Sequence, residues 1–147
     1  MTDVHSKEVR SYNMSRIRNK NTKPEQVVRK YLHKKGFRYL KNYTKLPGCP
    51  DIVLKKYRTC IFINGCFWHK HEGCKYFGWP KSNTEFWYKK IEENVERDRL
   101  NYQQLKDLGW KVILVWECEL RNGLLETTLE RVENIIRENC GNVNSKL

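Results

Sequence analysis

The stretch Arg58-Thr59-Cys60-Ile61-Phe62-Ile63-Asn64-Gly65 is a short apolar run that stops at a turn signal. An apolar run of this length, rich in β-branched and aromatic residues, is typical of a buried strand. Asn-Gly is a turn-forming pair. The sequence therefore predicts a buried strand from Arg58 to Ile63 that leads into a loop beginning at Asn64-Gly65.

Elements predicted on both sides of this strand complete an α/β domain. Upstream, Thr22-Lys23-Pro24-Glu25 is a capping-box pattern that begins a helix ending at about Lys35, before Gly36. A short strand over 51–54 follows a Pro/Gly turn. Downstream we expect a helix over 84–108 capped by Asn83, a buried strand over 111–116 and an amphipathic helix over 124–138. This order suggests a mixed central sheet flanked by helices.

Charge is distributed unevenly along the 147 residues. Residues 1–60 hold 16 Lys and Arg against 4 Asp and Glu, whereas residues 61–147 hold 13 of each sign. The net charge of +12 therefore belongs to the first part of the chain. Such a basic region favours a polyanionic partner, nucleic acid above all, over a merely soluble basic surface.

The length predicts one domain, with boundaries set by composition. We expect a basic N-terminal arm over 1–21 with a short helical stretch, a folded domain over 22–140 and a tail over 141–147. No apolar run is long enough to cross a membrane, and the first residues lack the apolar segment of a signal peptide. We therefore expect a cytoplasmic protein whose six cysteines are free thiols or metal ligands rather than disulfides.

The loop after the central strand is rich in metal-ligand residue types. Cys66, His71 and Cys74 offer three ligands at a spacing that a zinc loop can close, and Cys118 just past the strand over 111–116 could supply the fourth. The alternative is that these are ordinary small apolar cysteines. With His69 there are five candidate ligands and a closed zinc site needs four, so one histidine is left over, either for chemistry or for a structural hydrogen bond.

Three large aromatic residues accompany these candidate ligands. Phe67 and Trp68 lie inside the loop, and Trp87 follows in the next helix. Aromatic side chains beside a basic surface can stack on bases or wedge between base steps. A satellite hydrophobic cluster under a long loop explains the same residues, and the sequence alone leaves both readings open.

Three acidic residues occupy positions where chemistry is plausible. Asp51 opens a strand directly after a Pro-Gly-x-Pro turn, where a carboxylate can hold a hard cation or simply cap the turn. Glu25 could reach the same cation or complete the capping box. Asp98 falls on the inward stripe of the long helix and needs a partner there, either the spare histidine or a nearby arginine.

Taken together, these residues identify the chain as similar to the very short patch repair (Vsr) endonucleases over positions 3 to about 138. The blocks that carry the resemblance are Asp3-Val4-His5, Arg10-Ser11-x-Asn13-Met14, Leu46-Pro47-Gly48-x-Pro50-Asp51, Ile61-Phe62-x-x-Gly65-Cys66-Phe67-Trp68-His69, Thr84-Glu85-Phe86-Trp87, Asn94-Val95-Glu96-Arg97-Asp98 and Val115-Trp116-Glu117-Cys118.

The resemblance implies a restriction-endonuclease-like core and a DNA repair activity. It implies a Mg²⁺-dependent nick on the 5′ side of the thymine in a T·G mismatch, the lesion left when 5-methylcytosine deaminates. It implies a monomer acting on double-stranded DNA, with repair proteins acting downstream. The rivals are a zinc-containing DNA-binding module without catalysis and a restriction-like nuclease without mismatch selectivity.

The resemblance also implies roles for individual residues. The match to Asp51 binds Mg²⁺ with the backbone carbonyl of Ile63, and the match to Glu25 acts there through water. His69 performs acid–base chemistry with Asp98 behind it. The implied zinc ligands are Cys66, His71, Cys74 and Cys118, and the implied residues that enter the DNA are Phe67, Trp68, Trp87 and, from the arm, Met14.

Two positions depart from the family pattern. Glu72-Gly73 places two residues between the zinc histidine and the next cysteine, where the family has one, and Gly73 can absorb the difference. Ile63-Asn64 stands where the family has Thr-His. The backbone carbonyl at position 63 is the same whether the side chain is Thr or Ile, but the Asn64 side chain cannot perform acid–base chemistry.

Overall fold

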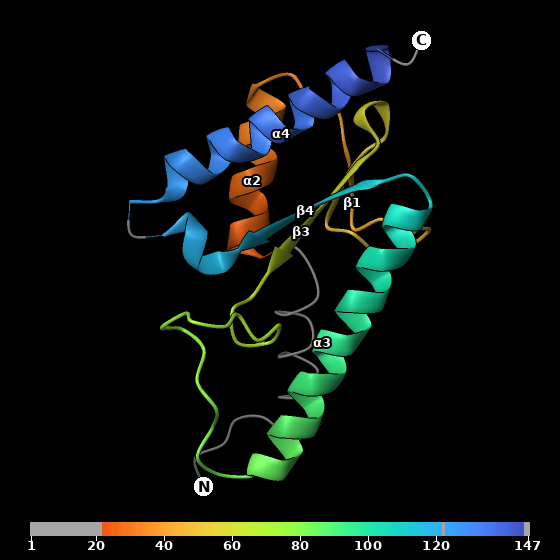
Figure 1. Cartoon of the computed structure of the whole chain (residues 1–147). Coiled ribbons are helices and arrows are strands. Elements are labelled where there is room, and N and C mark those ends of the chain that lie inside the picture. The colour runs from red at the N-terminus through yellow and green to blue at the C-terminus, as the bar shows by residue number, and fades with distance from the viewer. Residues whose placement is uncertain (1–21, 122, 146–147) are drawn as a thin grey trace, which may run out of the picture.

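The chain folds into a four-stranded mixed sheet with helices on both faces (Figure 1). The structure, a computed structural model, describes residues 22–121 and 123–145. Its helices are α2 (Lys23–Lys34), α3 (Thr84–Asp107) and α4 (Leu125–Ser145), with short 3-10 helices at Lys55–Tyr57 and Glu117–Leu120. Its strands are β1 (Leu40–Lys41), β2 (Ile52–Leu54), β3 (Thr59–Asn64) and β4 (Lys111–Trp116). The predicted mixed sheet flanked by helices is confirmed.

Strands β1, β2 and β3 are antiparallel neighbours, whereas β3 and β4 pair in parallel through the α3 crossover. The register sets Ile63 opposite Val115 and Asn64 opposite Trp116. Both strands therefore end at the same edge of the sheet. The loop after β3 and the 3-10 helix after β4 leave from that edge side by side. Cys66 and Cys118 therefore lie close together in the fold although they are far apart in the sequence.

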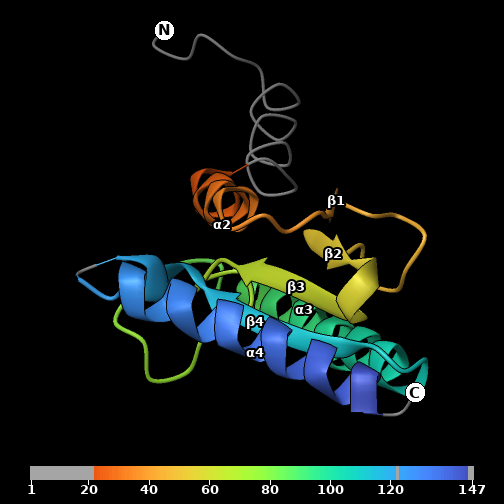
Figure 2. The same cartoon turned by 90° about the horizontal axis from the view of Figure 1, so that it is seen from above.

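Each face of the sheet has its own apolar core, because side chains alternate along a strand. Ile61 and its same-face neighbours pack against α2 and α4, whereas Cys60 and Phe62 pack against α3 with Leu105. Figure 2 shows α4 lying lengthwise along β3 and β4, with α2 on the side of β1 and β2. Cys60 is fully buried, as the sequence predicts for a core cysteine.

Helix α2 begins as its capping sequence predicts, since the Thr22 hydroxyl accepts from the Glu25 N–H at 3.4 Å. Val28 and Leu32, on the apolar stripe of the helix, are fully buried, whereas the neighbouring Val27 is exposed. It lies one position ahead of that stripe, about 100° around the helix from Val28.

Three further details differ from expectation. β1 is a two-residue, solvent-exposed strand that carries too short a pattern to be predicted. Asn83 precedes α3 in a left-handed conformation, with φ of 53°, and its side chain makes no capping hydrogen bond. Helix α4 ends at Ser145 rather than near Glu138, because no glycine or proline stop signal acts at that point and Gly141 is accommodated within the helix.

Within the described ranges, no helix is both long and apolar enough to span a lipid bilayer.

Candidate active site and metal centre

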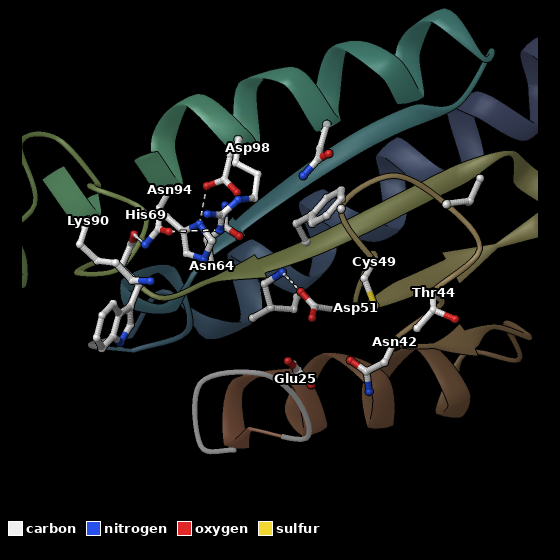
Figure 3. A pocket seen from close by; sticks show the side chains of 17 residues that line it. Glu25, Asn42, Thr44, Cys49, Asp51, Asn64, His69, Lys90, Asn94 and Asp98 are labelled. Atoms are coloured by element: carbon white, nitrogen blue, oxygen red, sulfur yellow. Dashed lines mark hydrogen bonds and ion pairs between the residues drawn. The ribbon is translucent and has the colours of Figure 1, made fainter. Parts of the chain in front are cut away.

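A cavity of about 770 Å³ opens between α2 and α3 at the end of β3. Six of its lining residues are sequence-predicted site residues, and the four titratable ones come from four different segments (Figure 3). Glu25 comes from α2, Asp51 from the turn before β2, His69 from the loop after β3 and Asp98 from α3. Folding thus collects into one pocket acidic and basic groups that lie up to 73 positions apart in the chain.

Asp51, which is half-buried, and Glu25, which is buried, form an acidic pair on one side of the cavity. The Ile63 N–H donates to Asp51 Oδ2 at 2.7 Å, and Glu25, which is only 2% exposed, pairs with Arg29. Burial, followed by the negative charge of Glu25, raises the pKa of Asp51 to about 8. Two desolvated carboxyl groups repel each other when both are ionised, and a hard divalent cation relieves that repulsion. The oxygen donors present fit Mg²⁺.

His69 and Asp98 form a second pair on the other side of the cavity. His69 Nδ1 lies 2.5 Å from Asp98 Oδ2, and both side chains are mostly buried. The carboxylate therefore holds one ring nitrogen, which leaves Nε2 as the nitrogen available to a reactant. Of the two partners that the sequence allowed for Asp98, the structure supplies the spare histidine.

The His69 backbone is held in place by its loop and by α3. The His69 N–H donates to the carbonyl of Gly65 at 3.2 Å, and the side-chain amide of Asn94 donates to the carbonyl of Trp68 at 3.1 Å. Asn94 lies one helical turn before Asp98. One stretch of α3 thus fixes both the ring of His69 and the peptide in front of it.

Asn64 lies beneath this pair at the end of β3 and is 3% exposed. Its amide donates to the Tyr102 hydroxyl at 3.0 Å. Burial, and then the charge of Asp98, raises the pKa of Tyr102 above its usual range. The Asn64–Tyr102 pair is therefore neutral near pH 7.

The candidate metal ligands Cys66, His71, Cys74 and Cys118 meet in one cluster. Their ligand atoms all lie within 4.8 Å of one another, and Cys118 Sγ is 3.4 Å from His71 Nδ1. Gly73 adopts a φ of +74°, a conformation open to glycine at little cost, and so takes up the additional residue before Cys74. The set of three thiols and one imidazole fits a tetrahedral zinc ion.

The electrostatics of this cluster also fit a cation. Burial raises the pKa of Cys66, and burial with the neighbouring thiols raises the pKa of Cys118 to about 12. Thiols this close resist ionising together unless a metal compensates their charge. The His71 ring stacks on Trp116 with centroids 4.1 Å apart, which ties the cluster to the end of β4.

The three aromatic residues of interest pack against one another beside the cavity. Phe67 lies 5.2 Å from Trp68 and 5.5 Å from Trp87, and Trp68 lies 5.8 Å from Trp87, measured between ring centroids. All three are half-buried. Between the metal cluster and the His69 pair, the loop thus presents a compact aromatic cluster, while Phe86 next to it is 60% exposed.

Sequence analysis missed several lining residues. Lys90, Asn94, Arg97 and Asn101 line the same wall of the cavity from α3. Their spacing of three to four positions around Asp98 is the signal that could have found them. Arg29, which pairs with Glu25, was also missed, because the pattern of α2 marks it only as a polar position near the apolar stripe. Met14 lies outside the described residues.

Comparison with known proteins places this geometry in context. Residues 2–75 match the family model described as "DNA mismatch endonuclease Vsr". A type II nicking enzyme of Neisseria meningitidis, V.NmeAIP, is 50% identical over 94% of this chain and 96% of its own length. The DNA mismatch endonuclease Vsr of Escherichia coli is 44% identical over 96% of this chain and 90% of its own length. A type II nicking enzyme of Xanthomonas oryzae, V.XorIIP, is 45% identical over 90% and 97% of the two lengths.

Proposed function

Because this chain belongs to the Vsr DNA mismatch endonuclease family, we propose that it nicks double-stranded DNA on the 5′ side of the thymine in a T·G mismatch. The observation that carries the proposal is one cavity holding a carboxyl pair and a His–Asp pair, with an aromatic cluster at its side. Phosphodiester hydrolysis needs a cation site, a proton-transfer group and a means of distorting the DNA, and this arrangement supplies candidates for each. The nick would initiate very short patch repair after 5-methylcytosine deamination.

The proposal includes a restriction-endonuclease-like core for the mixed sheet. In support, Asp51 precedes a strand whose neighbour, β3, donates a backbone N–H to it, so the acid lies in the cavity where β2 begins and β3 ends. We assign residues 22–140 to the endonuclease domain, residues 1–21 with Met14 to a DNA-contacting arm and residues 141–147, into which α4 continues as far as Ser145, to a tail. The described residues 22–60 are strongly basic and would add phosphate contacts, so binding should weaken steeply with salt.

Asp51 would hold Mg²⁺ together with the backbone carbonyl of Ile63, and Glu25 would contribute through water. Bound there, the ion would polarise the phosphate and stabilise the leaving oxygen. His69, oriented at Nδ1 by Asp98, would transfer a proton at Nε2. Asn64 takes no part in proton transfer and instead gives the cavity a neutral hydrogen-bonded floor with Tyr102.

Phe67, Trp68 and Trp87 would enter the base stack next to the mismatch. A T·G pair costs less to distort than a matched pair, which makes the wedge a source of selectivity. Zinc held by Cys66, His71, Cys74 and Cys118 would perform no chemistry and would stiffen the loop that carries Phe67 and Trp68. The protein would act as a monomer, because cutting one strand needs one active site. We also propose that it acts in the cytoplasm.

A nicking assay on two labelled duplexes in Mg²⁺ tests the proposal. One duplex carries T·G in a methylation-type context and the other the matched C·G pair. A single Mg²⁺-dependent nick 5′ of the thymine in the first duplex only is expected. Equal cutting of both duplexes would favour a restriction-like nuclease without mismatch selectivity. Binding without any cut, across a panel of flanking sequences, would favour a DNA-binding module.

A further inference from the structure

Arg29 is a buried cation beside the carboxyl pair. Its Nη1 lies 3.3 Å from Glu25 Oε2, and the two side chains are only 8% and 3% exposed. Removing a guanidinium from water is costly, and a buried ion pair is seldom a net source of stability. An exposed arginine one turn further along would bind solvent at no such cost. The buried position therefore calls for a reason beyond stability.

Arg29 is held in register with Glu25 by the helix that carries both. The two residues stand four positions apart on one face of α2. The backbone carbonyl of Arg29 accepts from the Tyr39 hydroxyl at 3.3 Å, which fixes this turn of α2 against the segment before β1. The guanidinium is thus held against Glu25, which lines the cavity, by a rigid element rather than by a loop.

The charge of Arg29 also reaches Asp51. Glu25 lines the same cavity as Asp51 and holds Arg29 at 3.3 Å, so the three charges belong to one cluster. Two carboxylates with one guanidinium carry a single negative charge. When a divalent cation binds, one positive charge remains, and a phosphodiester carries one negative charge. Without Arg29 the metal-loaded site would be neutral and would attract the substrate phosphate less strongly.

We propose that Arg29 is a positioning residue that serves as a permanent countercharge of the Glu25–Asp51 pair, holding Glu25 in the cavity and keeping the Mg²⁺-loaded site positive toward the scissile phosphate. The inference rests on the proposed function above. It predicts a trade-off, because the same positive charge that attracts the phosphate repels Mg²⁺. Arg29 should therefore weaken Mg²⁺ binding while increasing the rate of nicking.

The test compares Arg29→Met, which keeps length and loses charge, with Arg29→Lys, which keeps charge. Arg137→Met is the control, because Arg137 pairs with Glu133 four positions earlier on α4 but is exposed and does not line the cavity. Mg²⁺ binding to DNA-free protein is measured by calorimetry at pH 8.5. Nicking of the T·G duplex is measured at saturating Mg²⁺ under single-turnover conditions.

We expect Arg29→Met to bind Mg²⁺ roughly 3–10-fold more tightly and to nick about 10-fold more slowly, with DNA affinity nearly unchanged. Arg29→Lys should stay within about twofold of the parent in both measurements, as should Arg137→Met. Unchanged Mg²⁺ affinity in a folded Arg29→Met variant would overturn the proposal. Equal damage in Arg29→Met and Arg29→Lys would do the same, because it would indicate packing rather than charge.

Two further comparisons keep the outcome clear. If Arg29→Met does not fold, the double variant Glu25→Gln/Arg29→Met removes both buried charges, and it should bind Mg²⁺ more tightly than Glu25→Gln alone. If the parent protein nicks neither duplex, the proposed function fails. The calorimetric comparison of Mg²⁺ affinities still decides the role of Arg29 in that case.

Discussion

Asp98 holds His69 through a contact of 2.5 Å between Oδ2 and Nδ1, across 29 positions of sequence. The pair joins a helix to a loop that would otherwise be free to move relative to each other. Asn94, one turn earlier on α3, fixes the carbonyl of Trp68 directly before the ring. The aromatic cluster and the His–Asp pair therefore share one rigid support, so distortion of the DNA and proton transfer would be coupled through α3.

Replacing His69 by Ala should slow nicking of the T·G duplex by about 10²–10⁴-fold, because proton transfer at Nε2 is lost. Binding of the same duplex should stay within about twofold, since the basic surface and the aromatic cluster are untouched. Single-turnover nicking and equilibrium binding measure the two effects. The nicking rate of Asp98→Asn should lie between those of the parent and of His69→Ala. Undiminished nicking by His69→Ala would show that His69 takes no part in the mechanism.

Metal-free protein should lose stability as pH rises, because the pKa of Asp51 is about 8 when folded against an ordinary value of 3.8. A raised pKa means that the folded state binds the additional proton. The stabilisation is fully present below pH 3.8 and is lost as pH rises through about 8.

Urea unfolding in EDTA from pH 5 to pH 9 tests this sign. Asp51→Asn should show a flatter dependence than the parent. Mg²⁺ should stabilise the parent more at pH 8 than at pH 6, since the ion binds the ionised carboxylate. A difference between parent and Asp51→Asn that does not change with pH would contradict the assignment.

Disrupting the cluster proposed to bind zinc should lower stability and nicking together. We expect Cys118→Ser, or removal of metal by a chelator, to reduce the free energy of unfolding by more than about 2 kcal/mol. Tryptophan fluorescence should change as well, because the His71 ring stacks on Trp116. The matched control is Cys49→Ser, since Cys49 is exposed and lies outside the cluster. Bound zinc measured by atomic absorption should fall in Cys118→Ser only.

Truncating the aromatic cluster should reduce the preference of the protein for the T·G duplex over the matched duplex. We expect Trp68→Ala to weaken binding of the T·G duplex by roughly 1–3 kcal/mol, the usual value of one base–aromatic stack. Binding to the matched duplex, which relies on phosphate contacts, should change little. Tyr76→Ala serves as control, because that ring lies near Lys75 and Arg121 instead. Equal losses on both duplexes would argue against intercalation.

The Tyr31–Glu133 hydrogen bond joins α2 to α4 and should contribute about 1 kcal/mol. The Tyr31 hydroxyl, and then Arg137, lower the pKa of Glu133. A lowered pKa means stabilisation that is present above the ordinary value of 4.5 and is lost as pH falls below it. Tyr31→Phe should therefore cost stability at pH 7 and progressively less as pH falls through the lowered pKa of Glu133, measured by urea unfolding. Its nicking activity should be that of the parent.

Local patterns in the sequence were sufficient for the elements whose signals lie within one segment. The apolar run before Asn64-Gly65 predicted β3, and the Thr22 cap predicted the start of α2. Residue type and spacing identified the candidate zinc ligands, and the family resemblance chose His71 over His69 among them. Each of these features depends on backbone propensity or on ligand chemistry, which a short stretch of chain expresses by itself.

The tertiary structure alone decided which distant groups meet. Nothing in the sequence places the Ile63 N–H on Asp51, or Arg29 beside the acidic pair. The sequence likewise left open whether Asp98 would meet histidine or arginine. These contacts follow from the parallel pairing of β3 with β4 and from the packing of α2 and α3 on opposite faces of the sheet. Charge and hydrogen-bond energies depend on distances of a few ångströms between segments, and such distances exist only after the two cores have packed.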